Sequence, residues 1–165
     1  MPKRKTERRD FWGTPEVDSP RFGTGAVARI LEVELWELNR FLSRYKLSPD
    51  QLGQGRGSRL VYTVEDVYRI KIAMFLIRDG FAIKLVAQIM QQFEDRDFQG
   101  FQDREGGFWK LGISLWRSEK GPEVRFYRAD TPPEINPDSK TYYALNFSTI
   151  TRDVDRRIAE LEKKQ

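Results

Sequence analysis

The spacing of apolar residues changes between about residues 93 and 107 of this 165-residue chain, and that change limits the folds open to it. Up to about residue 93, apolar side chains recur at intervals of three and four, the period of an α-helix. From residue 107 they alternate with polar ones, as in Trp109, Leu111, Ile113 and Leu115, which is typical of a strand. A helical half followed by a strand-rich half predicts an α+β protein.

Composition excludes several classes of function. The chain has no cysteine and no histidine, which rules out thiolate metal sites, disulfides and histidine-based catalytic centres. No run approaches the roughly 18 apolar residues that span a bilayer, and the N-terminal sequence lacks the apolar core of a secretion signal. We therefore expect a cytoplasmic binding protein with no cofactor, no metal, no catalytic activity and no membrane contact.

Positive charge is concentrated at the N-terminus. Residues 1–10 hold five basic and two acidic side chains, and so carry +3 of the formal net charge of +4. Lys3, Arg4 and Lys5 suit an arm that lies along DNA phosphates, although a disordered, solubilising tail has the same composition. With the proline-containing linker that follows, residues 1–20 are expected to form an arm and linker outside the folded part.

Residues 21–95 have the pattern of a helix-turn-helix. Thr24 is expected to cap a short first helix, and a break near Glu32 precedes a second helix over about 34–46. The residues expected to face inward on the two helices are Val27, Ala28, Leu31, Leu35, Leu38, Phe41, Leu42 and Tyr45. Two tightly joined helices, the second with a polar outer face, are typical of a DNA-binding unit.

That polar outer face carries the first set of candidate DNA contacts. The candidates on and just after the second helix are Trp36, Asn39, Arg40, Ser43, Arg44 and Lys46. A guanidinium bonds guanine O6 and N7 together, so Arg40 is the candidate for base readout. Asn39 is a candidate for adenine, although it is expected nearer the buried edge, and Arg44 is a candidate phosphate contact.

A glycine-rich basic segment supplies the second set. Residues 54–59 read QGRGSR, and a β-branched and aromatic run follows, which predicts a small hairpin. On such a tip Arg56 and Arg59 would straddle phosphates or enter a minor groove. The alternative for both sets is a solvated surface, because acidic residues near the second helix, Glu34 and Glu37 among them, weaken attraction to phosphates.

Two more helices complete this unit. Thr63 is expected to cap a helix that is apolar nearly all round, and hence central to the core, and Gly80 is expected to end it. A further helix contains Leu85, Val86, Ile89, Met90 and Phe93 at helical spacing.

Residues 96–165 are expected to form a small antiparallel β-meander and a C-terminal helix. Tyr143 is expected on the inner face of its last strand and Tyr142 on the other, and aromatic residues of this half either fill the sheet core, which the pattern favours, or line an effector pocket. The final helix has an apolar stripe that docks on the meander or pairs with a second subunit, namely Phe147, Ile150, Val154, Ile158 and Leu161. This half is therefore a candidate effector, dimerisation or protein-contact region.

From Phe22 to Ile89, the order and spacing of these pieces resemble the winged helix-turn-helix of MerR-type bacterial transcription regulators. The matching pieces are residues 26–33 for the first helix and turn, Leu38 with Phe41, residues 57–67 for a wing strand and the next helix start, and Gly80-Phe81. Two features depart from the family pattern. The sequence Glu37-Leu38-Asn39 stands where the family usually has Thr-Leu-Arg, and no long dimerisation helix follows directly.

The resemblance implies a sequence-specific transcription regulator that binds double-stranded DNA as a homodimer, because paired half-sites supply the affinity that one module lacks. Two alternatives stay open. A DNA-packaging or architectural factor of a phage or mobile element would use the same module. A protein-interaction module would keep a degenerate helix-turn-helix that does not bind DNA.

Overall fold

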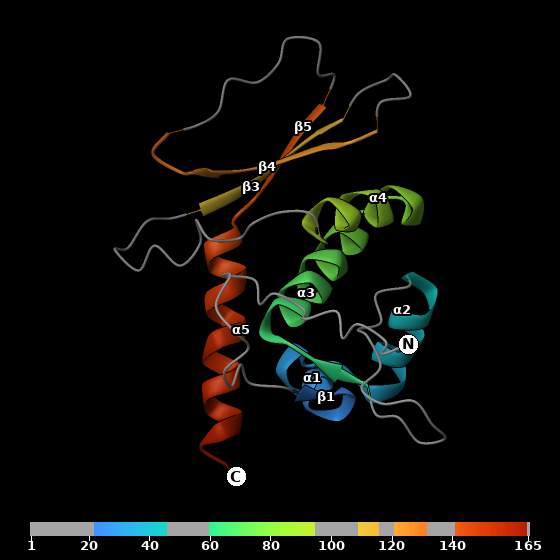
Figure 1. The fold of residues 1–165 in the computed structure, drawn as a ribbon, viewed down its shortest axis with the longest axis vertical. Helices are drawn as coiled ribbons and strands as arrows, with labels where there is room; N and C mark the ends of the chain where they lie inside the picture. The colour runs from blue at the N-terminus through green and yellow to red at the C-terminus, as the bar shows by residue number, and fades with distance from the viewer. Residues whose placement is uncertain (1–21, 46–59, 95–108, 116–120, 132–140, 165) are drawn as a thin grey trace, which may run out of the picture.

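The structure, a computed structural model, describes residues 22–45, 60–94, 109–115, 121–131 and 141–164. The basic arm with Lys3, Arg4 and Lys5 lies outside these residues, as do Lys46 and the predicted hairpin tip with Arg56 and Arg59. The elements are β1 (Phe22–Gly23), α1 (Thr24–Leu31), α2 (Leu35–Tyr45), β2 (Val61–Tyr62), α3 (Val64–Arg78), α4 (Ile83–Glu94), β3 (Trp109–Leu115), β4 (Glu123–Arg128), β5 (Thr141–Leu145) and α5 (Phe147–Glu162). Figure 1 shows the larger sheet at one end of the molecule, above the helices.

The first helix starts one residue earlier than the sequence predicts. Gly23, rather than Thr24, is the N-cap of α1, and no side chain caps this end. The reason is that β1 pairs antiparallel with β2, with Gly23 opposite Val61, so the chain enters the helix directly from a strand. At the other end Glu32 takes the left-handed conformation with φ 55°, and Val33 N–H donates to the Ala28 carbonyl at 3.0 Å.

The central helix forms where the sequence predicts it. The Thr63 hydroxyl accepts from the Asp66 N–H at 3.2 Å, and the Asp66 carboxylate accepts from the Thr63 N–H at 2.9 Å, a reciprocal cap. The helix ends at Arg78, and Gly80 follows with φ +91°, a conformation that glycine adopts without steric penalty. Buried side chains lie on several faces of α3, which confirms its central place; they are Val67, Ile70, Ile72, Ala73 and Leu76.

The larger sheet is antiparallel, but it is not a meander. Its strand order is β4-β3-β5, so β3 is central and pairs with both of the strands that follow it. A meander would place β4 in the centre and needs a short hairpin between β4 and β5. The connection from Arg128 to Thr141 is too long for that and allows β5 to reach the other edge of β3. The α+β class is confirmed, and the expected strand order is wrong.

Two side chains fasten this sheet to the helices. The Gln92 amide of α4 accepts from the Val124 N–H at 3.0 Å and donates to the Pro122 carbonyl, so it occupies part of the β4 edge. The Tyr143 hydroxyl of β5 donates to Asp79 at the end of α3, and this hydrogen bond raises the pKa of Tyr143 to about 12. Tyr143 also packs edge-on against Phe81, with ring centroids 4.9 Å apart.

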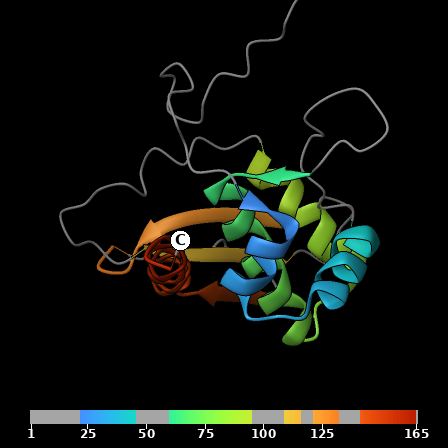
Figure 2. The same ribbon diagram turned by 90° about the horizontal axis from the view of Figure 1, so that it is seen from below.

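The apolar stripe of α5 is buried within the chain itself. Phe147 and Ile150 pack in a cluster with the sheet, α3 and α4. Val154 and Ile158 pack in a second cluster with α1, α2, β1, β2 and α3. Figures 1 and 2 show α5 alongside α1 and α3, and both clusters join residues from either side of position 95. The helix therefore docks on the helix-turn-helix as well as on the sheet.

Gly112 of the central strand makes room for the Tyr142 ring. The Tyr127 and Tyr142 rings come from the two edge strands, and their centroids lie 6.5 Å apart. A Cβ on Gly112 would lie 2.3 Å from the Tyr142 Oη. Of the aromatic residues in this half, Tyr143 therefore packs on the helical core, whereas Tyr142 lies across the face of the sheet that carries Gly112.

We expect Gly112→Ala to lower the free energy of unfolding by about 1–3 kcal/mol, because the added methyl displaces the Tyr142 ring. Urea unfolding of the purified protein measures this loss. In a Tyr142→Ala background the same substitution should cost much less. An equal loss in both backgrounds would show that the contact with Tyr142 is not the cause.

Candidate nucleic-acid interface

Helix α2 buries one side and exposes the other, as its sequence predicts. Leu38 and Leu42 are buried at 1% and 3% exposure against α1 and its neighbours. Leu35 was expected beside them, but it is 48% exposed. Side chains on a helix lean toward its N-terminus, so the first residue of α2 projects past the helix end, where no preceding turn packs against it.

The outward side brings together five of the predicted site residues. Each of these residues is exposed, and they are Trp36, Asn39, Arg40, Ser43 and Arg44. Trp36, at 61% exposure, is the most exposed of the large apolar side chains that the structure describes. Asn39 is exposed as well. The helix thus presents donors, acceptors and an apolar ring on one surface, which is what base edges in a major groove require.

Several arginines in the described residues pair with acids, but the two arginines of α2 do not. Arg156 and Arg157 of α5 bond Asp153 at 2.8 and 3.1 Å, and Arg125 of β4 pairs with Glu123. In the part of the chain that the structure describes, neither Arg40 nor Arg44 forms an ion pair. Their guanidinium groups therefore remain available to an external anion.

The acidic residues that weaken the case for DNA are partly engaged by the protein. The Glu37 Oε2 accepts from the Glu34 N–H at 3.3 Å at the start of α2, where the helix dipole favours a negative charge. The Glu32 carboxylate pairs with Arg157, which lowers the pKa of Glu32 through a side-chain hydrogen bond. Negative charge therefore gathers at the first turn of α2, and positive charge lies further along it at Arg40 and Arg44.

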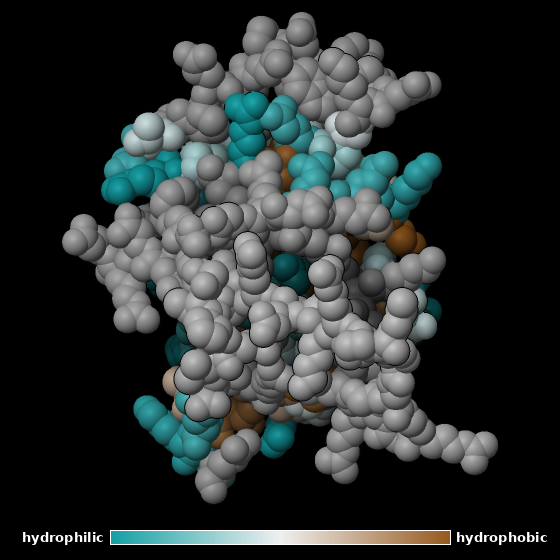
Figure 3. Space-filling model, in the orientation of Figure 1, coloured by the Kyte–Doolittle hydropathy of each residue, from teal (hydrophilic) through white to brown (hydrophobic). Residues whose placement is uncertain are grey.

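The rest of the fold leaves the outward side of α2 clear of α5. Figures 1 and 2 place α2 and α5 on opposite sides of the bundle, with α1 and α3 between them. The described side chains visible over the sheet in Figure 3 are mainly hydrophilic, and hydrophilic and hydrophobic ones are mixed at the C-terminal end of α5. The docked C-terminal helix therefore does not compete for the surface that α2 presents.

Comparison with known families agrees with this geometry. The family model described as MerR HTH family regulatory protein matches residues 22–92. The matched segment, residues 22–92, is named the MerR-type region. The match confirms the resemblance seen in the sequence and runs from β1 to α4. The sheet β4-β3-β5 and α5 lie beyond the MerR-type region. A comparison with curated proteins finds no match to this chain.

The link between α5 and the turn of the MerR-type region could not be read from the sequence. Within α5 the charged side chains pair at helical spacing, since Asp153 bonds both Arg156 and Arg157. The bond to Arg156 is the main reason that the pKa of Asp153 is lowered. The second partner of Arg157 is Glu32, which is remote in the chain, and no local pattern connects the two.

Among the residues that the structure describes, no three His, Cys, Asp or Glu side chains are placed to hold a metal ion. None of the described helices is long and apolar enough to cross a membrane.

Proposed function

We propose that this protein is a sequence-specific DNA-binding transcription regulator that inserts α2 into a major groove. One observation carries the proposal: in a MerR-type region, α2 exposes Trp36, Arg40 and Ser43 opposite its buried Leu38 and Leu42. One side of such a helix packs against the protein core, and the opposite side contacts base edges in the DNA groove.

Each exposed side chain has a role that follows from its chemistry. Arg40 bonds guanine through O6 and N7, and Asn39 bonds adenine. Trp36 and Ser43 pack against sugar or a thymine methyl group, and Arg44 bonds phosphate. Lys46, Arg56, Arg59 and the arm with Lys3, Arg4 and Lys5 lie outside the described residues and remain predicted phosphate or minor-groove contacts.

We also propose that the protein acts as a cytoplasmic homodimer on a two-fold DNA site, without catalytic activity. Paired half-sites give the affinity that one module lacks. Because the apolar stripe of α5 is buried within its own chain, a dimer would use another surface. The C-terminal region remains our candidate for contact with a protein partner.

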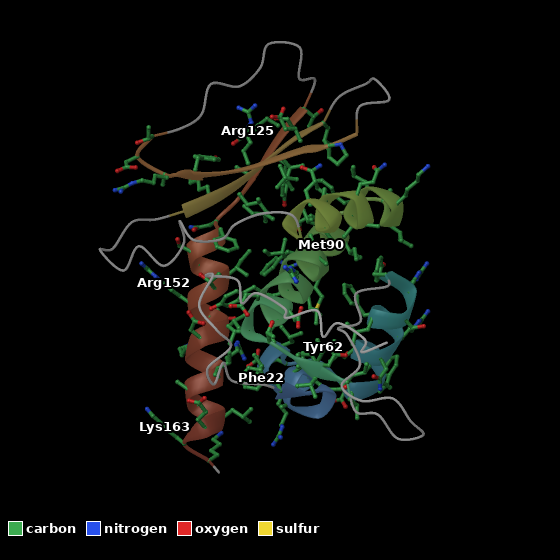
Figure 4. All side chains as sticks on the ribbon, viewed as in Figure 1. Phe22, Tyr62, Met90, Arg125, Arg152 and Lys163 are labelled. Atoms are coloured by element: carbon green, nitrogen blue, oxygen red, sulfur yellow. The ribbon has the colours of Figure 1, made fainter. Side chains whose placement is uncertain are left out.

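We expect Arg40→Ala to weaken binding to the preferred DNA site about 5- to 150-fold, since a bidentate base contact contributes about 1–3 kcal/mol. Selection from a random double-stranded pool defines the site, and fluorescence anisotropy measures the affinity. Arg125→Ala is the matched control, because it removes the same charge from the distant sheet (Figure 4). Equal losses in the two variants would contradict a base contact by Arg40.

The same assay separates the two alternatives. Tight binding with no sequence preference, and with affinity that falls steeply as salt rises, would indicate a packaging or architectural factor. A full-length protein that binds no member of the pool would indicate an interaction module. The guanidinium groups of α2 are exposed and form no ion pair with the described residues, which favours the regulator over that second alternative.

A further inference from the structure

The turn between α1 and α2 contains an unusual residue. Glu32 occupies the left-handed conformation with φ 55°, and it is the one non-glycine residue in the described chain with a positive φ. Glycine is the usual residue at such a helix C-terminus, because a Cβ is crowded there. Helix α2 begins three residues later at Leu35, so the conformation of Glu32 helps set the direction in which α2 leaves the turn.

A side chain from the far end of the sequence holds this glutamate. Arg157 of α5 donates to the Glu32 carboxylate through one terminal nitrogen, while its Nε donates to the Asp153 Oδ2 at 3.1 Å. The Arg157 side chain is only 17% exposed, against 65% for Glu32. Asp153 therefore orients the guanidinium toward the turn, and Arg157 is largely enclosed where it makes the contact.

The helix that carries Arg157 is itself anchored to the MerR-type region. Val154 and Ile158, three residues before and one after, are buried in the cluster that contains α1 and α2. The Tyr68 hydroxyl of α3 donates to Asp155, and Lys71 Nζ of α3 lies 3.8 Å from the Asp153 Oδ2. Arg157 thus extends from a helix whose position is fixed by its packing against α1, α2 and α3.

Helix α5 follows directly after the last strand of the sheet. Strand β5 ends at Leu145, Asn146 caps α5 by accepting from the Thr149 N–H at 3.4 Å, and Phe147 begins the helix. The helix that carries Arg157 is therefore joined to β5 through the single residue Asn146.

We propose that Arg157 is a positioning residue for DNA binding: it holds Glu32 in the left-handed conformation and thereby sets how α2 is presented. The contact makes the C-terminal helix, which lies beyond the MerR-type match, part of the DNA-reading device. This inference rests on the proposed function for its effect on affinity, but its structural part does not.

The test compares Arg157→Met with Arg156→Met in the full chain. Both variants remove one positive charge and one bond to Asp153, but only Arg157 contacts the turn. We expect Arg157→Met to weaken binding to the selected DNA site about tenfold, within the range of ordinary couplings between sites, and Arg156→Met to change it less than twofold. Urea unfolding of both variants shows whether their global stabilities match.

A second substitution distinguishes positioning from general stabilisation. Glycine adopts the left-handed conformation without help, so Glu32→Gly in the Arg157→Met background should restore most of the affinity. Glu32→Gln in the same background removes the same negative charge but keeps the Cβ, and should not restore it. Absence of rescue by glycine, or equal rescue by both, would overturn the proposal.

Amide hydrogen exchange gives a readout that needs no DNA. The Glu32 and Val33 N–H groups donate to the carbonyls of Arg29 and Ala28 at 3.2 and 3.0 Å. Their exchange should accelerate in Arg157→Met and not in Arg156→Met. If the wild type bound no DNA but this pattern held, the proposed function would fail while the positioning contact stood; unchanged exchange would reject the contact itself.

Discussion

Val154→Asp is expected to remove most of the protein's stability and to unfold a large fraction of the molecules at 25 °C. Val154 is fully buried, and it packs in the cluster that contains α1, α2 and α3. A carboxylate at this position must either lose its hydration or take up a proton, and an unpaired buried charge costs several kcal/mol. Domains of this size have only about 5–15 kcal/mol of stability to lose.

Urea unfolding followed by circular dichroism measures the effect, and two-dimensional NMR spectra show which regions lose structure. Ala159→Asp is the matched control, because it places the same carboxylate on the exposed side of the same helix. We expect the control to lower the free energy of unfolding by less than about 1 kcal/mol. A small effect of Val154→Asp would mean that α5 does not dock on the MerR-type region.

Leu111→Ala should have the second largest effect, a loss of about 2–5 kcal/mol. Leu111 lies in the central strand β3, opposite Phe126 of β4 and Leu145 of β5, and it is fully buried. It belongs to the cluster that also contains residues of α3 and α4. Truncation to alanine leaves a cavity in this shared core, which the neighbouring strands on both sides can only partly close.

The Leu111→Ala substitution should also destabilise the helices that pack against the sheet. Because the sheet and α3 share one cluster, NMR signals from α3 and from β3 should disappear at the same urea concentration, in the wild type and in Leu111→Ala alike. Lys110→Ala, at the neighbouring position on the opposite face of β3, should change stability by less than about 0.5 kcal/mol. Two separate transitions would show that the halves unfold independently. The division into residues 21–95 and 96–165 remains a prediction that this measurement tests.

Local signals in the sequence predicted the individual elements well, because each depends on neighbouring residues. The reciprocal cap of Thr63 and Asp66 involves residues three apart, and the apolar side of α2 involves a repeat within a few turns. Two local expectations were wrong. Thr24 does not cap α1, because strand pairing places Gly23 there, and Leu35 is exposed, because it begins its helix.

The part of the candidate site that depends on neighbouring residues was also predictable from the sequence. The exposed side of α2 follows from helical geometry, so Trp36, Arg40 and Ser43 lie where a step of about 100° per residue puts them. The contact between Arg157 and Glu32 was not predictable, because it joins two side chains that only the docking of α5 brings together.

The sequence by itself determined the α+β class and the outward face of α2, since both follow from short-range periodicity, and it carried the resemblance to the MerR-type family over residues 22–92. Only the tertiary structure decided that β3 is the central strand and that α5 packs along the MerR-type region. Both depend on which distant segments of the chain pack together. A repeat of apolar residues indicates that one face of an element is buried, but it does not indicate which other element covers that face.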